Sequence, residues 1–75
     1  MTKTLYDLKA GERGTVIELY QGYQFLHRMS ALGIFVDKEI EVISRQPLGG
    51  PLTIRVGTSD VSIGQGMAKK IYMKE

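Results

Sequence analysis

Cysteine is absent from this chain of 75 residues, and histidine occurs once, as His27. Without cysteine the chain can form neither a disulfide framework nor a thiolate metal site, and nothing favours an oxidising compartment. The longest wholly apolar run, Ile34 to Val36, is far shorter than the roughly 20 residues that span a membrane. Residues 1–14 contain no apolar signal-peptide core. We therefore expect a cytoplasmic protein.

A strong excess of charge of either sign is also missing. Ten Lys and Arg residues against eight Asp and Glu residues leave a net charge of +2. The basic residues are spread along the chain, and only Lys69 and Lys70 are adjacent. A nucleic-acid-binding surface normally needs a concentrated basic patch, so no nucleic-acid partner is predicted. Small barrels often bind nucleic acids, and such binding would show a steep salt dependence.

The length and the residue pattern predict a small, mostly β fold. A chain of this size buries only about 60% of its unfolded surface, so we expect one domain with one modest core, residues 1–75. Alternating or β-branched segments predict five strands, at 15–19, 39–45, 52–56, 61–63 and 71–73. Single helical turns are expected at 5–8 and 64–68. Glycine-marked turns between short strands favour a five-stranded SH3-like barrel, which hides its strand edges by closing.

One short α-helix is predicted at residues 21–32, inserted between the first and second of these strands. Its apolar residues fall within an arc of about 120° and should cap the barrel. They are Phe25, Leu26, Met29 and Leu32. Gly33 is expected to end the helix in a left-handed conformation. The next three residues, Ile34, Phe35 and Val36, are expected to return to the core as extended chain.

No catalytic constellation is evident. The neighbours of His27 at helical spacing include no carboxylate, so we interpret it as a solvated histidine near a helix C-terminus. No serine is framed as a nucleophile, and the glycine-containing turns at 57–60 and 64–66 are incomplete as phosphate or dinucleotide motifs. We therefore predict that the protein is not an enzyme and needs no cofactor.

Three carboxylates, Asp37, Glu39 and Glu41, are spaced two apart, so they would share one face of a regular strand. Such a face could hold a hard cation through oxygen. A solvated acidic face opposite Lys or Arg, with Arg55 as one candidate, is favoured. A ferrous or zinc site usually includes His or Cys as well, and none lies nearby in sequence. No metal site is predicted.

Two segments are candidates for binding a partner. Tyr20 and Tyr23 flank the start of the helix on its non-core side, as an exposed anchor pair or folded down beside the barrel. The loop at 47–51 is stiffened by two prolines and either displays Leu48 or folds it back on the barrel. The candidate partner-binding residues are Tyr20, Tyr23, Leu48, Gly49, Gly50 and Pro51.

Four motifs in order along the chain carry a resemblance to a known family. They are L-x-x-L-x-x-G-x-x-G-T-V from Leu5 to Val16, L-x-x-M-x-x-L-G-I from Leu26 to Ile34, G-G-P-L from Gly49 to Leu52, and V-x-I-G-x-G-M-A-x-x-I from Val61 to Ile71. Together they resemble the FeoA family of small ferrous-iron transport accessory proteins. Asp37 departs from the family, where a glycine is expected. Asp tolerates left-handed backbone next best, so the turn should be kept.

The resemblance implies an SH3-like barrel with an inserted helix. It also implies a non-enzymatic cytosolic accessory protein that binds and regulates FeoB, the membrane ferrous transporter with a cytosolic GTP-binding domain. Contact with the membrane would then be indirect, through the transporter. A similar barrel forms the C-terminal domain of iron- and manganese-responsive repressors. The alternative hypothesis is therefore a carrier or sensor module that binds a transition metal directly. Neither the oligomeric state nor the direction of regulation follows from the sequence.

Overall fold

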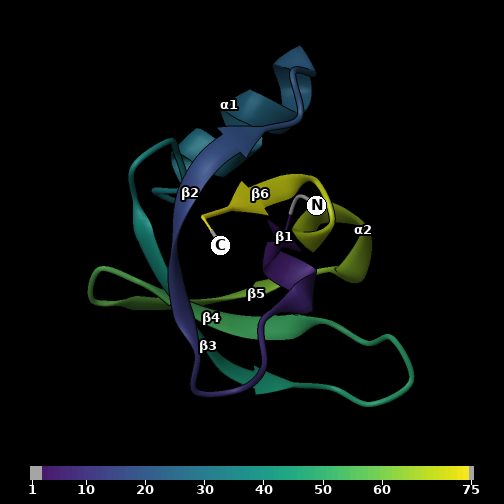
Figure 1. The fold of residues 1–75 in the computed structure, drawn as a ribbon. Helices are drawn as coiled ribbons and strands as arrows, with labels where there is room; N and C mark the ends of the chain where they lie inside the picture. Colours follow the sequence, from purple (N-terminus) through teal and green to yellow (C-terminus); the bar gives the residue numbers. More distant parts are fainter. Residues whose placement is uncertain (1–2, 75) are drawn as a thin grey trace.

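The computed structural model describes residues 3–74, which form one antiparallel sheet of six strands in the order β1-β6-β2-β3-β4-β5 (Figure 1). The strands are β1 (Lys3–Thr4), β2 (Arg13–Leu19), β3 (Glu39–Arg45), β4 (Leu52–Val56), β5 (Ser59–Ile63) and β6 (Ile71–Met73). The helices are the 3-10 turn η1 (Leu5–Asp7), α1 (Tyr23–Ala31) and α2 (Gln65–Ala68). None of these helices is long and apolar enough to cross a membrane.

The mostly β character and the five predicted strands are confirmed, but the closed five-stranded barrel is wrong. A sixth strand, β1, pairs with β6 through Lys3 with Met73 and Thr4 with Tyr72. In the described part of the chain β1 and β5 are the two ends of the sheet and do not pair with each other, so the sheet is curved but open. A strand of two residues shows no apolar alternation, which is why the pattern missed it. Strands β2 and β5 also begin two residues before their predicted starts.

The core lies inside the curve of the sheet. Its buried residues come mainly from alternate positions of the strands, as the side-chain period of two requires. They are Leu5, Leu8, Val16, Leu19, Met29, Ile34, Ile40, Val42, Leu52, Ile54, Val56, Ile63, Ala68, Ile71 and Met73. Helix α1 covers one end of this core, and η1 and α2 lie together beside β6 (Figure 1).

A β-bulge in β2 brings its end next to the segment that follows α2. The pairing with β6 shifts register between Val16 and Glu18, and Ile17 at the shift is exposed. Bulges bend a strand and increase its twist. Beyond the bulge the backbone N–H of Tyr20 donates to the carbonyl of Lys70 at 3.0 Å. This bond fixes Tyr20 beside Lys70 where the chain turns into α1.

The predicted end of the helix at Gly33 is confirmed. Gly33 has φ +83°, its N–H donates to Ser30 O at 3.0 Å, and Ile34 N–H donates to Met29 O at 2.8 Å. These two bonds form a Schellman motif, which needs a left-handed residue that glycine adopts without a Cβ penalty. The helix itself is shorter than predicted, because it begins at Tyr23 and has Leu32 as its C-cap.

The predictions for the segment after the helix are only partly right. Ile34 is buried, but Phe35 and Val36 are exposed, and Leu32 is only half-buried against the core. The cause is a turn in place of an extended chain. Lys38 N–H donates to Phe35 O at 3.1 Å, and Asp37 has φ +76°.

Asp37 confirms the prediction that this turn survives without glycine. Its N–H donates to Val16 O at 2.8 Å, and Val16 N–H donates to Lys38 O at 2.9 Å. These bonds tie the turn to β2 ahead of the bulge. Aspartate is among the few side chains that visit left-handed backbone routinely, so the position can serve without a glycine.

Truncating Met29 to alanine should destabilise the protein far more than truncating Leu32. Met29 is fully buried and Leu32 only half-buried, so Met29→Ala should cost about 2–5 kcal/mol and Leu32→Ala clearly less. The whole domain is expected to have only roughly 4–11 kcal/mol of stability, so the first change should shift the urea midpoint visibly. Equal shifts for the two variants would show that α1 docks through a different face.

Candidate functional site

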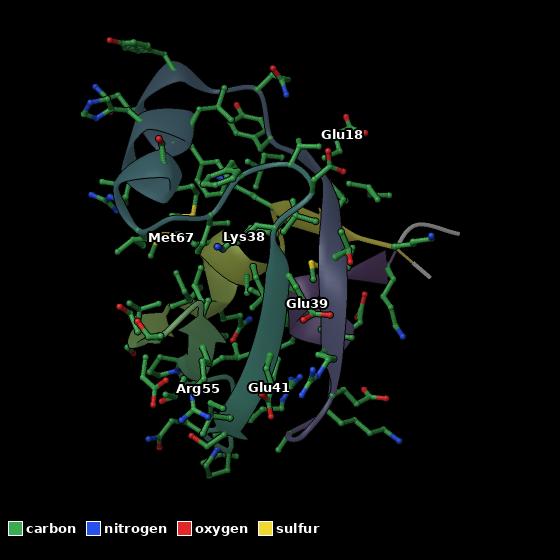
Figure 2. The ribbon with its side chains drawn as sticks, turned by 90° about the vertical axis from the view of Figure 1, so that its left-hand side faces the viewer. Glu18, Lys38, Glu39, Glu41, Arg55 and Met67 are labelled. Atoms are coloured by element: carbon green, nitrogen blue, oxygen red, sulfur yellow. The ribbon has the colours of Figure 1, made fainter. Side chains whose placement is uncertain are left out.

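A groove of about 510 Å³ is bounded by three parts of the chain: the end of β2, helix α1, and the segment formed by α2 and Lys70. We call it the aromatic groove. It is lined by Tyr20, Gly22, Tyr23, Gln24, Phe25, Arg28, Met67 and Lys70. Figure 2 shows Met67 directly below α1, so α2 supplies the lower wall of the groove. A groove of this size can take one or two side chains of a partner.

Aromatic rings hold a cation at the wall of this groove. The rings of Tyr20 and Phe25 meet edge to face, with centroids 6.1 Å apart. The ammonium of Lys70 lies 4.8 Å from the Tyr20 centroid and 5.7 Å from that of Phe25. A cation within about 6 Å of a ring face is attracted by the ring quadrupole. The position of Lys70 is therefore set by both its backbone bond to Tyr20 and these two rings.

The second cation of the groove, Arg28, comes from α1. Its guanidinium donates to the thioether sulfur of Met67 at 3.7 Å. Neither Arg28 nor Lys70 has an ion pair with any side chain of residues 3–74, and neither α1 nor the groove lining contains an acidic residue. The residues that line the groove therefore carry two positive charges and no negative charge.

The two predicted anchor tyrosines take different positions. Tyr20 is half-exposed and folds down onto Phe25 and Lys70, whereas Tyr23 is 76% exposed and stacks on His27 with ring centroids 6.4 Å apart. Both line the aromatic groove. Sequence reasoning missed Phe25, Arg28, Met67 and Lys70 as members of this site. The helical spacing could have placed Arg28 on the same face of α1 as Gln24, one turn further along, but nothing in the sequence places Lys70 there.

The second predicted segment, loop 47–51, lies at the end of the sheet opposite α1 (Figure 1). Leu48 is fully exposed at its tip with φ +61°, so it does not fold back on the barrel. Gly49 has φ +76° and lies against the side chain of Gln65, where a Cβ would collide with it. The loop is thus anchored on α2 and closed by the bond from Gln46 N–H to Pro51 O at 3.2 Å. The structure does not bring this loop and the two tyrosines into one site.

A second, charged groove of about 470 Å³ contains the three carboxylates that the sequence singled out. Its lining is Arg13, Asp37, Lys38, Glu39, Glu41, Arg55 and Gly57. Glu39 and Glu41 lie along β3, Lys38 lies just before it, and Arg55 lies beside Glu41 (Figure 2). Arg13 lies 3.8 Å from both Glu39 and Glu41, which confirms an acidic face opposed by arginine for these two carboxylates. Asp37 does not share the strand face, because it lies in the left-handed turn before β3. Sequence reasoning missed Arg13, because its pairing depends on the β2–β3 register.

Arg55 is one candidate cation for the acidic face. It is the partner of Glu41 in register on β4, but it hydrogen-bonds elsewhere. Its guanidinium donates to both carboxylate oxygens of Asp60 on β5, at 2.8 and 3.1 Å. Hydrogen bonding to Arg55 is the main reason why the pKa of Asp60 lies below its ordinary value. The same hydrogen bonding raises the pKa of Arg55.

The described residues offer no ready-made metal site. No three or more His, Cys, Asp or Glu side chains among residues 3–74 gather closely enough to hold a metal ion. His27 lies exposed on α1 against Tyr23. Glu39 and Glu41 each lie within 4 Å of Arg13 and offset its charge, and Asp37 and Lys38 line the same groove.

Comparison with known proteins identifies relatives over nearly the whole chain. The sequence model of the FeoA domain family matches residues 3–75. An Fe(2+) transport protein A of Methanocaldococcus jannaschii is 31% identical over 67 residues, which cover 89% of this chain and 79% of that protein.

Solved structures agree with this result. The crystal structure of an iron uptake regulatory protein, FeoA, has a TM-score of 0.90 at 26% identity and covers 99% of this chain and 97% of its own. A manganese-dependent transcriptional repressor has a TM-score of 0.86 at 23% identity and covers 96% of this chain but only 40% of the repressor. The likeness to the repressor shows a shared fold alone, and these neighbours support an SH3-like fold.

Removing Arg55 should return the pKa of Asp60 towards its ordinary value. In the native protein Asp60 is ionised at a lower pH than in the unfolded chain, so its contribution to stability is present above the unfolded pKa and is lost as pH falls through the native one. NMR titration of Asp60 in Arg55→Ala should show the rise, with Arg13→Ala as control. A pKa of Asp60 that is unchanged in Arg55→Ala would mean that the hydrogen bond is absent in solution.

The isolated protein should bind no transition metal tightly. One exposed histidine and carboxylates already opposed by arginine lack the paired soft ligands that Zn²⁺ or Fe²⁺ prefers. Anaerobic calorimetric titration at low salt should detect no stoichiometric site of submicromolar affinity. Tight binding that His27→Ala abolishes would overturn this expectation and favour a metal carrier.

Proposed function

This chain belongs to the FeoA family, and we propose that it is a non-enzymatic cytosolic accessory protein that binds and regulates an FeoB-type ferrous iron transporter. The observation that carries the proposal is the family match over residues 3–75, together with a relative of 31% identity that is named for Fe(2+) transport. The partner surface on the transporter would be its cytosolic GTP-binding domain. The accessory protein would then meet the membrane only through the transporter.

The conformation of Leu48 supports a binding role for loop 47–51. A residue other than glycine in left-handed backbone costs about 1–2 kcal/mol. Leu48 is fully exposed, so no burial within the free protein offsets this cost. Backbone strain of this kind is often kept where a side chain is displayed for a ligand or partner. Leu48 is therefore a candidate anchor for the transporter.

The exposed tyrosines support a second contact at the other end of the molecule. Tyrosine is enriched among the residues that dominate binding energy, because its large ring loses little conformational entropy. Tyr20 and Tyr23 both line the aromatic groove, and Tyr23 is largely exposed. A partner that engages both ends would have to extend along the molecule, since the two segments lie at opposite ends of it (Figure 1).

The fold likeness to a manganese-dependent repressor favours one alternative, a module that senses or carries a transition metal. A shared fold does not carry a shared site. The described residues of this chain do not supply a group of metal-ligating side chains, so the accessory role has the stronger support.

Replacing Leu48 should weaken binding to the transporter and leave the fold intact. Asp and Asn both tolerate left-handed backbone, so Leu48→Asp and Leu48→Asn should each remove the apolar side chain without disturbing the loop. The neutral variant separates the lost side chain from the added charge. Affinity for the cytosolic part of the transporter from the same organism, measured by calorimetry, should fall about tenfold or more.

The double change of Tyr20 and Tyr23 to Ala should weaken the same interaction by a similar factor. For Leu48→Asp, the matched control for added charge is Thr58→Asp, in the exposed turn between β4 and β5, which should bind like the parent. Circular dichroism on the same samples checks folding. Folded variants that bind like the parent would exclude these surfaces as the interface, and a parent that does not bind the domain would refute the proposed function.

A further inference from the structure

On the basis of the proposed function, we propose that the aromatic groove binds an acidic segment of the partner protein, in which an apolar side chain is flanked by Asp or Glu. The partner is thereby defined by its chemistry. The apolar side chain would pack between the rings and the thioether, and the flanking carboxylates would meet the two cations.

The groove has an apolar floor with room left above it. Phe25 and Met67 are both half-buried and pack against the core, so each presents its remaining surface to the groove. Tyr20 closes one side, with its ring edge to face with Phe25. Because the floor belongs to packed elements, it is already formed in the free protein, which reduces the cost of ordering on binding.

The two cations of the aromatic groove have no acidic partner among residues 3–74. In the charged groove, by contrast, Arg13 and Arg55 each lie within 4 Å of a carboxylate. Arg28 and Lys70, in contrast, line a groove that contains no acidic residue. Charge complementarity then favours a negatively charged occupant.

The shape and the charge of the groove favour a peptide over other anions. Two cations flanking a volume of about 510 Å³ suit one apolar side chain with neighbouring carboxylates. Nucleic acids need a longer row of cations along a phosphate backbone, and the net charge of this chain is only +2. The aromatic floor also matches an apolar side chain, which a free phosphate lacks.

Fluorescence anisotropy with short labelled peptides tests the chemistry directly. The probe is a peptide with one Phe flanked by Asp and Glu, and it should bind the protein with an affinity that falls as salt rises. One control peptide carries Asn and Gln in place of the acids, and another carries Ala in place of Phe. Each control should bind about tenfold more weakly. Equal binding of the acidic and neutral peptides would overturn the proposal.

Charge-reversal variants then locate the site. Arg28→Glu and Lys70→Glu change exposed residues, so the fold should persist, and each should lower the affinity for the acidic peptide about tenfold. Lys9→Glu makes the same charge change in the exposed segment before β2, whereas α1 follows the other end of that strand, and this variant should bind like the parent. Loss of affinity that is equal in all three variants would indicate a net-charge effect and overturn the assignment of the groove.

The same variants, titrated with the cytosolic part of the transporter, separate this inference from the proposed function. A transporter domain that binds the parent and Lys70→Glu equally, with no binding of the acidic peptide, would overturn the inference and leave the proposed function standing. Peptide binding that depends on the groove, without any binding of the transporter domain, would refute the proposed function and leave the acidic-segment chemistry of the groove standing. Anionic vesicles or single-stranded DNA that bind through Arg28 and Lys70, in the absence of peptide binding, would also overturn the inference.

Discussion

The left-handed turn at Gly33 is the constraint on which the rest of the structure depends. It ends α1, and Ile34, which follows it, enters the same buried core as Met29. A helix of nine residues is not stable alone in water and persists only through this docking. The aromatic groove exists because the docked helix stands beside α2 and the end of β2. A loss of the turn would therefore remove the site together with the helix.

The two grooves differ in how their charges are satisfied, and this difference carries most of the functional argument. In the charged groove, arginines from β2 and β4 meet carboxylates from β3 and β5. Exposed ion pairs of this kind add little stability. Because the paired charges largely cancel, they also exert little net attraction on a charged ligand. In the aromatic groove, Lys70 is held by rings and Arg28 by a thioether, neither of which cancels a positive charge. The molecule therefore presents one nearly neutral groove and one cationic groove.

The chain belongs to the FeoA family and has a relative named for Fe(2+) transport, yet its fold is shared with a manganese-dependent repressor. A fold common to such different proteins cannot by itself define a function, which must be argued from sites. For this chain the surfaces that we propose as contact sites are a leucine in left-handed backbone at the tip of a loop and a cationic, aromatic groove at the opposite end. Both suit recognition of another protein better than chemistry on a small molecule.

Local rules acting on the sequence alone determined five of the six strands, the end of α1 and the left-handed turn at Asp37, because alternation, glycine and aspartate act within a few residues. The family motifs are also local, and they revealed the family. Pairings between distant segments decided the rest. Strand β1 exists only because Lys3 meets Met73, and Phe35 is exposed because the turn at Asp37 is tied to β2. The aromatic groove likewise depends on Lys70 reaching Tyr20 through the β2–β6 pairing, a contact that no local pattern encodes.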